Sequence, residues 1–190
     1  MKIFLRLGII FIVAVVLISL LKPFVDDYRE AQKYDFKVNT ADGPITKKSF
    51  IGKPLAVYFG YSYCPDVCPT SLSSLAQALD SFDKEKTKDF VGLFISVDPD
   101  RDTLENLKQY AGYFHPNFIG ATSNKENIDD ITKRYGTYYQ KVQLDDSAIG
   151  YSVAHTSFIY LFDRDGKFRG KVDHFSDPAQ IKIKLKEILE

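Results

Sequence analysis

The only two cysteines of this 190-residue chain, Cys64 and Cys68, stand four positions apart at the junction of two contrasting patterns. Residues 55–60 form a continuous apolar run, which predicts a strand buried on both faces. Residues 71–82 repeat apolar side chains at helical spacing, which predicts a helix. A cysteine pair between a core strand and the helix that follows it indicates a thioredoxin-like fold.

Further apolar runs continue this alternation of strands and helices. Core strands are predicted at residues 90–97 and 157–162, and shorter strands at 34–38, 118–120 and 167–172. Helices are predicted at residues 104–114 and 124–135, with a last one after Asp177. The spacing of Asp102 and Glu105 predicts a capping box at the start of the 104–114 helix. We therefore expect an α/β sheet that helices cover on both faces.

The N-terminal segment has the composition of a membrane anchor. Residues 3–21 carry one charge, Arg6, and are otherwise almost entirely apolar, which is close to the roughly 20 residues that a bilayer core requires. Lys2 and Arg6 on the N-terminal side favour a cytoplasmic N-terminus and an exported remainder. A cleaved signal peptide is the alternative, although no small-x-small cleavage site follows Leu21. The expected organisation is a transmembrane anchor at 1–22, a stalk at 23–33 and one thioredoxin-like domain at 34–190.

The charge balance of the exported part argues against nucleic acid as a partner. Residues 1–22 contain three basic and no acidic residues, so the remainder has 22 Lys and Arg against 25 Asp and Glu. A mildly acidic domain without a basic stripe lacks the electrostatic footprint of a nucleic-acid-binding protein.

The two cysteines have a chemical rather than a stabilising value. A disulfide that closes so short a loop adds little stability, although a cysteine pair outside the membrane suits an oxidising compartment. A helix start lowers the pKa of nearby thiols and so favours the thiolate, which binds metals and attacks disulfides. Cys64 and Cys68 can therefore close as a disulfide bond or hold one soft metal ion, and the sequence leaves both uses open.

Among the three histidines, His155 is the one placed to join the cysteines. It directly precedes the predicted strand at 157–162, and in a thioredoxin-like sheet this segment passes beside the cysteine loop. His115 and His174 are expected to be solvated or helix-capping residues. Two thiolates and one imidazole suit copper or zinc, whereas a structural zinc site would want a fourth ligand. Three donors suit Cu(I), but chance placement of His155 remains the alternative at this point.

A second polar cluster follows the predicted strand at 90–97. Asp98, Asp100 and Asp102 gather three carboxylates within five positions, which is the composition of a hard-ion site. We interpret them instead as a loop and a helix cap.

Three sequence blocks resemble the Sco/SenC family. They are GYSYCPDVCP at residues 60–69, ISVDPDRDT at 95–103 and YSVAHT at 151–156, and the resemblance covers roughly residues 35–190 together with the N-terminal anchor. It implies a thioredoxin-fold copper protein, tethered to the inner membrane with its domain on the periplasmic side, that helps to assemble the dinuclear CuA centre of cytochrome c oxidase. Cys64, Cys68 and His155 match the family's copper ligands. Family members commonly have Asp directly before this histidine, where the chain has Ala154.

The resemblance favours a copper chaperone over an enzyme. Such a protein would take copper, as Cu(I) with Cu(II) as the second state, from a copper-delivering protein and pass it to the oxidase subunit that carries CuA. The alternative is a thiol–disulfide oxidoreductase that acts on protein cysteines through Cys64 or Cys68. A thiol peroxidase and an anchored interaction domain with a surface disulfide are the remaining hypotheses.

Overall fold

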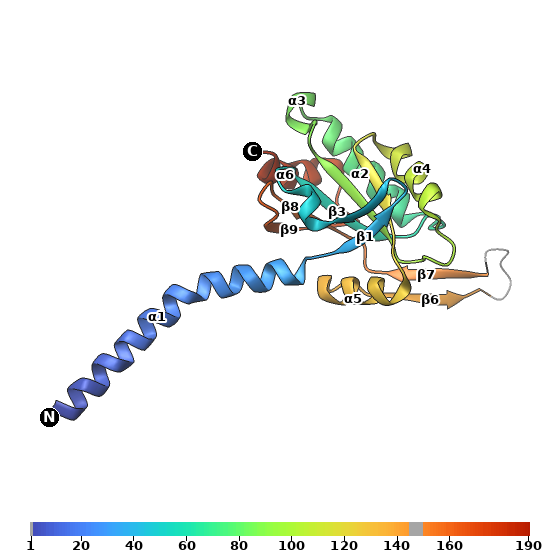
Figure 1. Ribbon diagram of the computed structural model, residues 1–190. Helices are drawn as coiled ribbons and strands as arrows, with labels where there is room; N and C mark the ends of the chain where they lie inside the picture. The colour runs from blue at the N-terminus through green and yellow to red at the C-terminus, as the bar shows by residue number, and fades with distance from the viewer. Residues whose placement is uncertain (1, 145–149) are drawn as a thin grey trace. The chain divides into compact units, whose positions relative to one another are not determined.

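The computed structural model describes residues 2–144 and 150–190, and the chain divides into two compact units (Figure 1). The first unit ends at Lys33 and consists of the helix α1 (Lys2–Lys33), which contains Pro23. Within the described residues, no helix combines the length and the apolar character needed to cross a membrane, and the predicted anchor is therefore not confirmed.

The second unit, Tyr34–Glu190, contains a five-stranded sheet, two separate two-stranded sheets and the helices that pack on them. Its strands are β1 (Lys37–Thr40), β2 (Gly43–Thr46), β3 (Leu55–Gly60), β4 (Val91–Ser96), β5 (Phe118–Ala121), β6 (Tyr139–Gln143), β7 (Tyr151–His155), β8 (Phe158–Phe162) and β9 (Phe168–Asp173). Its helices are the 3-10 turn η1 (Lys47–Phe50), α2 (Val67–Asp80), α3 (Lys84–Thr87), α4 (Leu104–Phe114), α5 (Lys125–Tyr135) and α6 (Pro178–Leu189).

The central sheet has the strand order β5-β4-β3-β8-β9. Strands β3, β4 and β5 run parallel, whereas β8 is antiparallel to β3 and β9 is antiparallel to β8. Every residue of β3 is buried, as the continuous apolar run at 55–60 predicts. The parallel strands end at the same edge, so the loops that follow β3 and β4 lie next to each other there.

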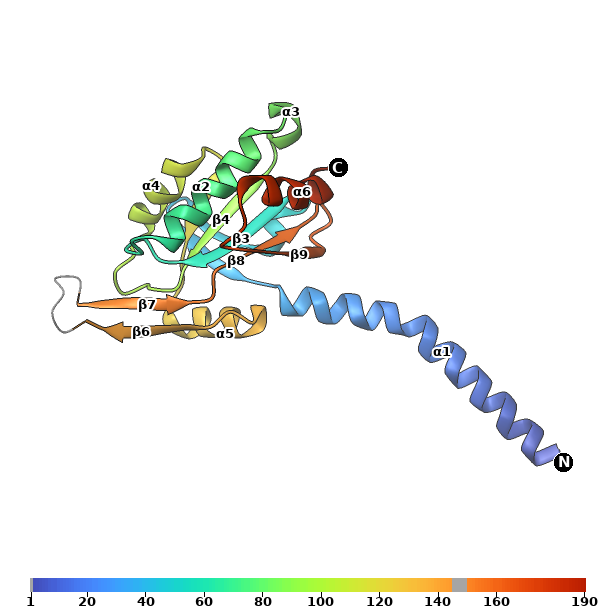
Figure 2. The same cartoon turned by 180° about the vertical axis from the view of Figure 1, so that it is seen from behind.

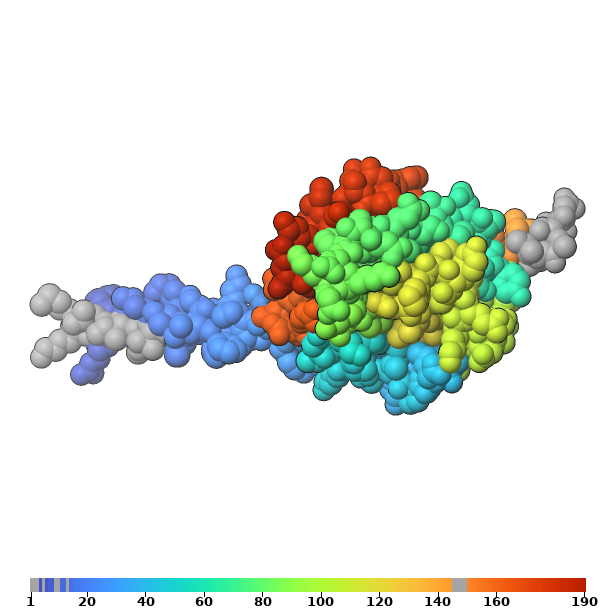
Figure 3. Space-filling model, turned by 90° about the horizontal axis from the view of Figure 1, so that it is seen from above, coloured from blue at the N-terminus to red at the C-terminus, as the bar shows by residue number. Residues whose placement is uncertain are grey.

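Helices cover both faces of this sheet, as the alternating pattern predicts. Tyr58 of β3 stacks on Phe94 of β4, and the Phe94 ring centroid lies 5.2 Å from that of Tyr110 on α4. Phe59 points to the opposite face, where its ring centroid lies 5.0 Å from that of Tyr135 on α5. Figure 2 shows α2, α4 and α6 on one face and α5 on the other. In the space-filling view of Figure 3, the surfaces of α6 (red), α2 (green) and α4 (yellow-green) lie next to one another.

Several element boundaries differ from the prediction for identifiable reasons. Helix α2 begins at Val67 rather than at residue 71, because its first turn tolerates Pro69, whose missing N–H needs no partner there. The first strand is Lys37–Thr40 rather than 34–38, although Phe36 is buried in the core. The predicted last helix begins as expected, with Asp177 in a capping box.

The predicted cap of α4 is wrong. Its N-cap is Thr103, whose hydroxyl accepts from the backbone N–H of Asn106 at 3.2 Å. Asp102 is buried instead and accepts hydrogen bonds from Ser62 and Ser96. An acidic residue three positions before a glutamate looks the same in the sequence whether it caps a helix or is buried as a hydrogen-bond acceptor. The pattern alone therefore does not distinguish the two roles of Asp102.

The sequence pattern does not predict the two strands of the hairpin that β6 and β7 form. It pairs Tyr139 with His155 and Gln143 with Tyr151, and it forms a sheet of its own. Both strands have only five residues, and β6 is mostly polar while β7 mixes polar and apolar residues, so neither is long enough to show the apolar alternation by which a half-buried strand is recognised.

Candidate metal centre

The structure brings Cys64, Cys68 and His155 together. One ligand atom from each residue lies within 4.8 Å of the other two, and the Cys68 Sγ is 3.3 Å from the His155 Nε2. Cys64 comes from the loop after β3, Cys68 from the first turn of α2, and His155 from the end of β7. Within the part of the chain that the structure describes, no other group of three or more His, Cys, Asp or Glu residues converges in this way.

The loop after β3 fixes the two sulfur atoms. The backbone N–H of Cys64 donates to the Tyr61 carbonyl at 3.2 Å, and the backbone N–H of Cys68 donates to the Cys64 Sγ at 3.4 Å. Gly60 makes room for this arrangement, because a Cβ at that position would lie 2.6 Å from the Cys68 Sγ. Both cysteines are free thiols.

The carboxylate of Asp102 supports the same loop. It accepts from the backbone N–H of Ser62 at 3.0 Å and also from the hydroxyls of Ser62 and Ser96. The residue predicted to cap α4 therefore holds the chain two positions before Cys64. Sequence reasoning missed this role because residues 62 and 102 lie 40 positions apart.

The imidazole of His155 is oriented by its neighbours. Its ring meets those of Tyr58 and Tyr61 edge-on, at centroid distances of 6.3 and 5.9 Å. Its Nδ1 lies 3.3 Å from both the Ser157 hydroxyl and the Thr156 carbonyl. A hydrogen bond at one ring nitrogen sets the tautomer and leaves the other to bind a metal, so Nε2 is the nitrogen available beside Cys68.

The two thiols differ in acidity. The hydrogen bond with Cys68, followed by one with His155, holds the pKa of Cys64 well below its usual range. Burial raises the pKa of Cys68, and the neighbouring Cys64 raises it further. The predicted lowering is therefore confirmed for Cys64 and wrong for Cys68, where desolvation outweighs the helix start. Metal binding would release the Cys68 proton, because the ligand form of cysteine is the thiolate.

The three candidate ligands differ in their exposure to solvent. Cys68 is fully buried, whereas Cys64 and His155 are half-buried and line a groove of about 370 Å³. Ala154, which stands where the Sco/SenC pattern commonly has Asp, is exposed and lines the same groove. An ion held by the three donors would thus be reachable from one side only.

The other two histidines lie elsewhere. The Nδ1 of His115 accepts from the backbone N–H of Asn117 at 3.0 Å, so this residue ends α4 as a local cap. His174 follows β9, where its ring centroid lies 3.8 Å from that of Phe175. Neither ring joins the cysteine cluster.

Comparison with known proteins identifies one family. The SCO1/SenC family model matches residues 26–190. An SCO2-like protein of Rickettsia conorii is 39% identical over 135 residues, which cover 70% of this chain and 65% of that protein. The human mitochondrial SCO1 homolog is 39% identical over 131 residues, covering 68% of this chain and 42% of that protein. The chain thus spans just under two thirds of the first relative and less than half of the second.

Solved structures agree in fold. The crystal structure of Arabidopsis thaliana ScoI with copper bound matches with a TM-score of 0.74 and 35% identity, over 82% of this chain and 96% of that one. The structure of Bradyrhizobium japonicum ScoI with copper bound matches with a TM-score of 0.71 and 36% identity, over 81% of this chain and 97% of that one. The α/β domain described above is therefore the fold of these copper-bound proteins.

Proposed function

This chain belongs to the SCO1/SenC family, and from that premise we propose that it is a copper chaperone that binds Cu(I) through Cys64, Cys68 and His155. The observation that carries the proposal is the convergence of these three donor atoms within 4.8 Å of one another. The copper-bound state of the two similar ScoI structures supports the choice of metal.

The donor set favours copper over harder ions. Soft thiolate ligands select Cu(I), and a borderline imidazole nitrogen completes a three-coordinate site. A structural zinc site would need a fourth ligand. Within the described residues no further His, Cys, Asp or Glu joins the cluster to supply one.

The graded exposure suits a cargo rather than a permanent cofactor. Cys64 and His155 face the groove, so a cysteine thiolate of a recipient protein can approach the ion from that side. Copper can then transfer by ligand exchange, because the recipient thiolate binds the ion before Cys68, the buried ligand, dissociates from it. We propose the CuA-bearing subunit of cytochrome c oxidase as the recipient and a separate copper-delivering protein as the donor, in keeping with the Sco/SenC resemblance.

Membrane attachment is part of the same proposal. The nearly uncharged residues 3–21 would anchor the chain in the inner membrane, with residues 34–190 on the periplasmic side. Carbonate extraction of membranes tests it, because an anchored chain stays in the pellet. Protease added to spheroplasts should then digest the domain, and full protection of residues 34–190 would contradict the orientation.

Metal analysis of the reduced full chain in detergent tests the site. We expect about one copper per chain, with sulfur and nitrogen scatterers in the X-ray absorption spectrum. Loss of an outer-shell partner typically costs about 10–100-fold in metal affinity, so loss of a ligand through His155→Ala should cost at least as much. His115→Ala is the matched control, because that ring lies outside the cluster. Equal affinity of His155→Ala and the parent would remove His155 from the ligand set.

Thiol–disulfide exchange on protein cysteines is the second candidate. The low pKa and partial exposure of Cys64 favour it, since the thiolate is the attacking form. This activity would need both cysteines, whereas His155 would contribute only the hydrogen bond that helps to lower the pKa of Cys64. Reduction of a disulfide-bonded substrate by His155→Ala at the parent's rate, in copper-free medium, would favour it over the chaperone.

A further inference from the structure

The carboxylate of Asp98, on the loop that follows β4, is fully buried and bonded at both oxygens. Its Oδ2 accepts from the Arg101 Nε at 2.6 Å, and its Oδ1 accepts from the Tyr151 hydroxyl at 2.8 Å. A buried charge is tolerated only where partners of this kind compensate for its lost hydration. Asp98 is therefore fixed, and it fixes Tyr151, the first residue of β7.

Arg101 holds the same tyrosine in two further ways. Its Nη1 donates to the Tyr151 carbonyl at 2.9 Å, and its guanidinium carbon lies 3.7 Å from the centroid of the Tyr151 ring. On the neighbouring strand, the Lys141 Nζ lies 2.6 Å from the Asp100 carboxylate and 4.4 Å from the same ring centroid. Both strands of the hairpin are thus tied to the loop at 98–102.

The hairpin needs such an attachment. Among the residues that the structure describes, β6 and β7 pair with each other and not with the central sheet, and an isolated two-stranded hairpin is at best marginally stable in water. His155 ends the five-residue strand that Tyr151 begins, so the position of its imidazole follows from the position of β7. We propose that Asp98, Arg101 and Tyr151 form a latch that positions His155 against Cys68.

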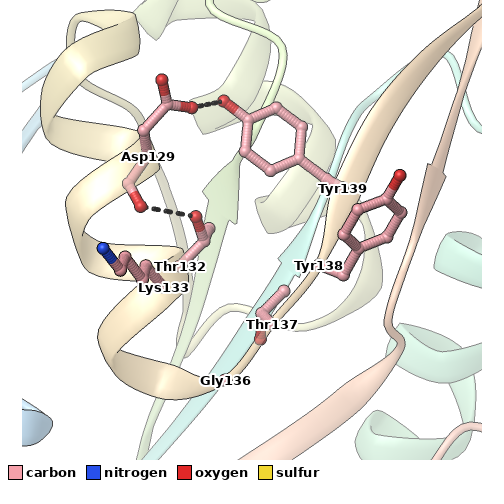
Figure 4. Close-up of a pocket in the computed structure, with 7 residues that line it drawn as sticks. All are labelled: Asp129, Thr132, Lys133, Gly136, Thr137, Tyr138 and Tyr139. Carbon is pink, nitrogen blue, oxygen red and sulfur yellow. Dashed lines mark hydrogen bonds between the residues drawn. The ribbon is translucent and has the colours of Figure 1, made fainter.

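A second attachment limits how much the latch carries. Figure 4 shows the Tyr139 hydroxyl directed at Asp129 of α5, beside a hollow of about 330 Å³, and the two groups are hydrogen-bonded. Tyr139 holds β6, whereas Tyr151 holds β7. Loss of the latch should therefore loosen the His155 strand without releasing the whole hairpin.

The inference rests on the proposed copper site, and Tyr151→Phe in the full chain tests it. The substitution removes one hydroxyl and its bond to Asp98 while keeping the ring under Arg101. Tyr138→Phe is the matched control, because the Tyr138 hydroxyl, one residue before β6, donates to Gln140 of that strand and, among the described residues, to no other element. Competition with a Cu(I) chelator should show binding weakened by up to about tenfold for Tyr151→Phe, the lower end of the loss when a group bonded directly to a ligand is removed, and no change for the control.

A double-mutant cycle shows whether the effect passes through His155. In the His155→Ala background, Tyr151→Phe should cause no further loss of copper affinity, because the group that it positions is already gone. An undiminished loss in that background would overturn the latch, as would parent-like affinity of Tyr151→Phe alone.

Amide hydrogen exchange of the copper-free chain gives a readout that does not depend on metal. The amides of β7 should exchange faster in Tyr151→Phe than in Tyr138→Phe, and equal rates would overturn the latch. Should the parent bind no copper, or bind it equally well without His155, the proposed function fails instead. Faster exchange in Tyr151→Phe would then show that the hairpin is still held in the way inferred here.

Discussion

Alanine in place of Gly60 should displace the Cys68 sulfur and weaken both the fold and the site. A Cβ on Gly60 would lie 2.6 Å from the Cys68 Sγ and 2.8 Å from a ring carbon of Phe94. Ordinary contacts begin at 3.4 Å, so the sulfur would have to retreat by 0.8 Å, the difference between 3.4 and 2.6 Å. Cys68 and Phe94 are both buried in the core, so either can move only by displacing the side chains packed around it.

The predicted clash leads to an expected size for both the loss of stability and the loss of copper affinity. Inserting one carbon into a packed core costs about 1–3 kcal/mol of unfolding free energy. The 0.8 Å shift of the sulfur is several times the roughly 0.2 Å by which metal–ligand distances vary, so copper affinity should fall by about tenfold or more. Urea unfolding of the copper-free chain and chelator competition measure the two quantities separately.

Gly112→Ala provides a control of opposite sign. Gly112 lies within α4, and outside the helix's own backbone no atom of the described residues stands within 4 Å of a Cβ built there. The alanine should stabilise the chain by roughly 0.5–1 kcal/mol, because glycine is costly inside a helix, and copper affinity should not change. A Gly60→Ala protein as stable as the parent, with the same copper affinity, would refute the argument from close packing.

Three further predictions test other parts of the site and the core. Iodoacetamide should alkylate Cys64 much faster than Cys68 at pH 6, and lowering the pH from 8 to 6 should hardly slow the reaction of Cys64, because its lowered pKa keeps it a thiolate. Peptide mass spectrometry measures the two alkylation rates, and equal rates would contradict the prediction. Tyr110→Phe should stabilise the chain by about 1 kcal/mol, since among the described residues its buried hydroxyl has no hydrogen-bond partner; a loss in urea unfolding would reveal one. Ala154→Asp, at an exposed position, should leave the unfolding free energy within about 0.5 kcal/mol of the parent, and a larger fall would mean that the carboxylate disturbs the groove.

The central sheet could be predicted because a strand that is buried on both faces has a continuous run of apolar residues in the sequence. Strands β3, β4 and β8 lie inside the domain, so nearly every position in them is apolar, and the runs at 55–60, 90–97 and 157–162 stand out. The cysteine loop is fixed by its place between β3 and α2. Cys64 and Cys68, two of the three candidate ligands, thus lie between two elements that short local sequence patterns predict.

The hairpin could not be predicted in the same way. Besides the buried Val153, β7 makes polar contacts to Asp98 and Arg101, and Tyr151 lies 53 positions from the first and 50 from the second. Polar side chains in a loop have the same local appearance whether they are solvated or buried against a distant strand. For this reason the sequence favours a loop and a helix cap for the carboxylates at 98–102, whereas in the structure Asp98 and Asp102 are both buried.

The candidate ligands come from two kinds of element, the junction of β3 and α2 in the core and the separate β6–β7 hairpin. Cys64 and Cys68 belong to the rigid junction of β3 and α2, which Gly60 and Asp102 hold in place. His155 belongs to a hairpin that, among the described residues, shares no strand pairing with the central sheet and contacts the rest of the domain through side chains such as Tyr151. A site that keeps two ligands rigid and the third on a separately attached strand can change its coordination number without disturbing its core. That property is what a protein needs if it must first hold a metal ion and then give it up.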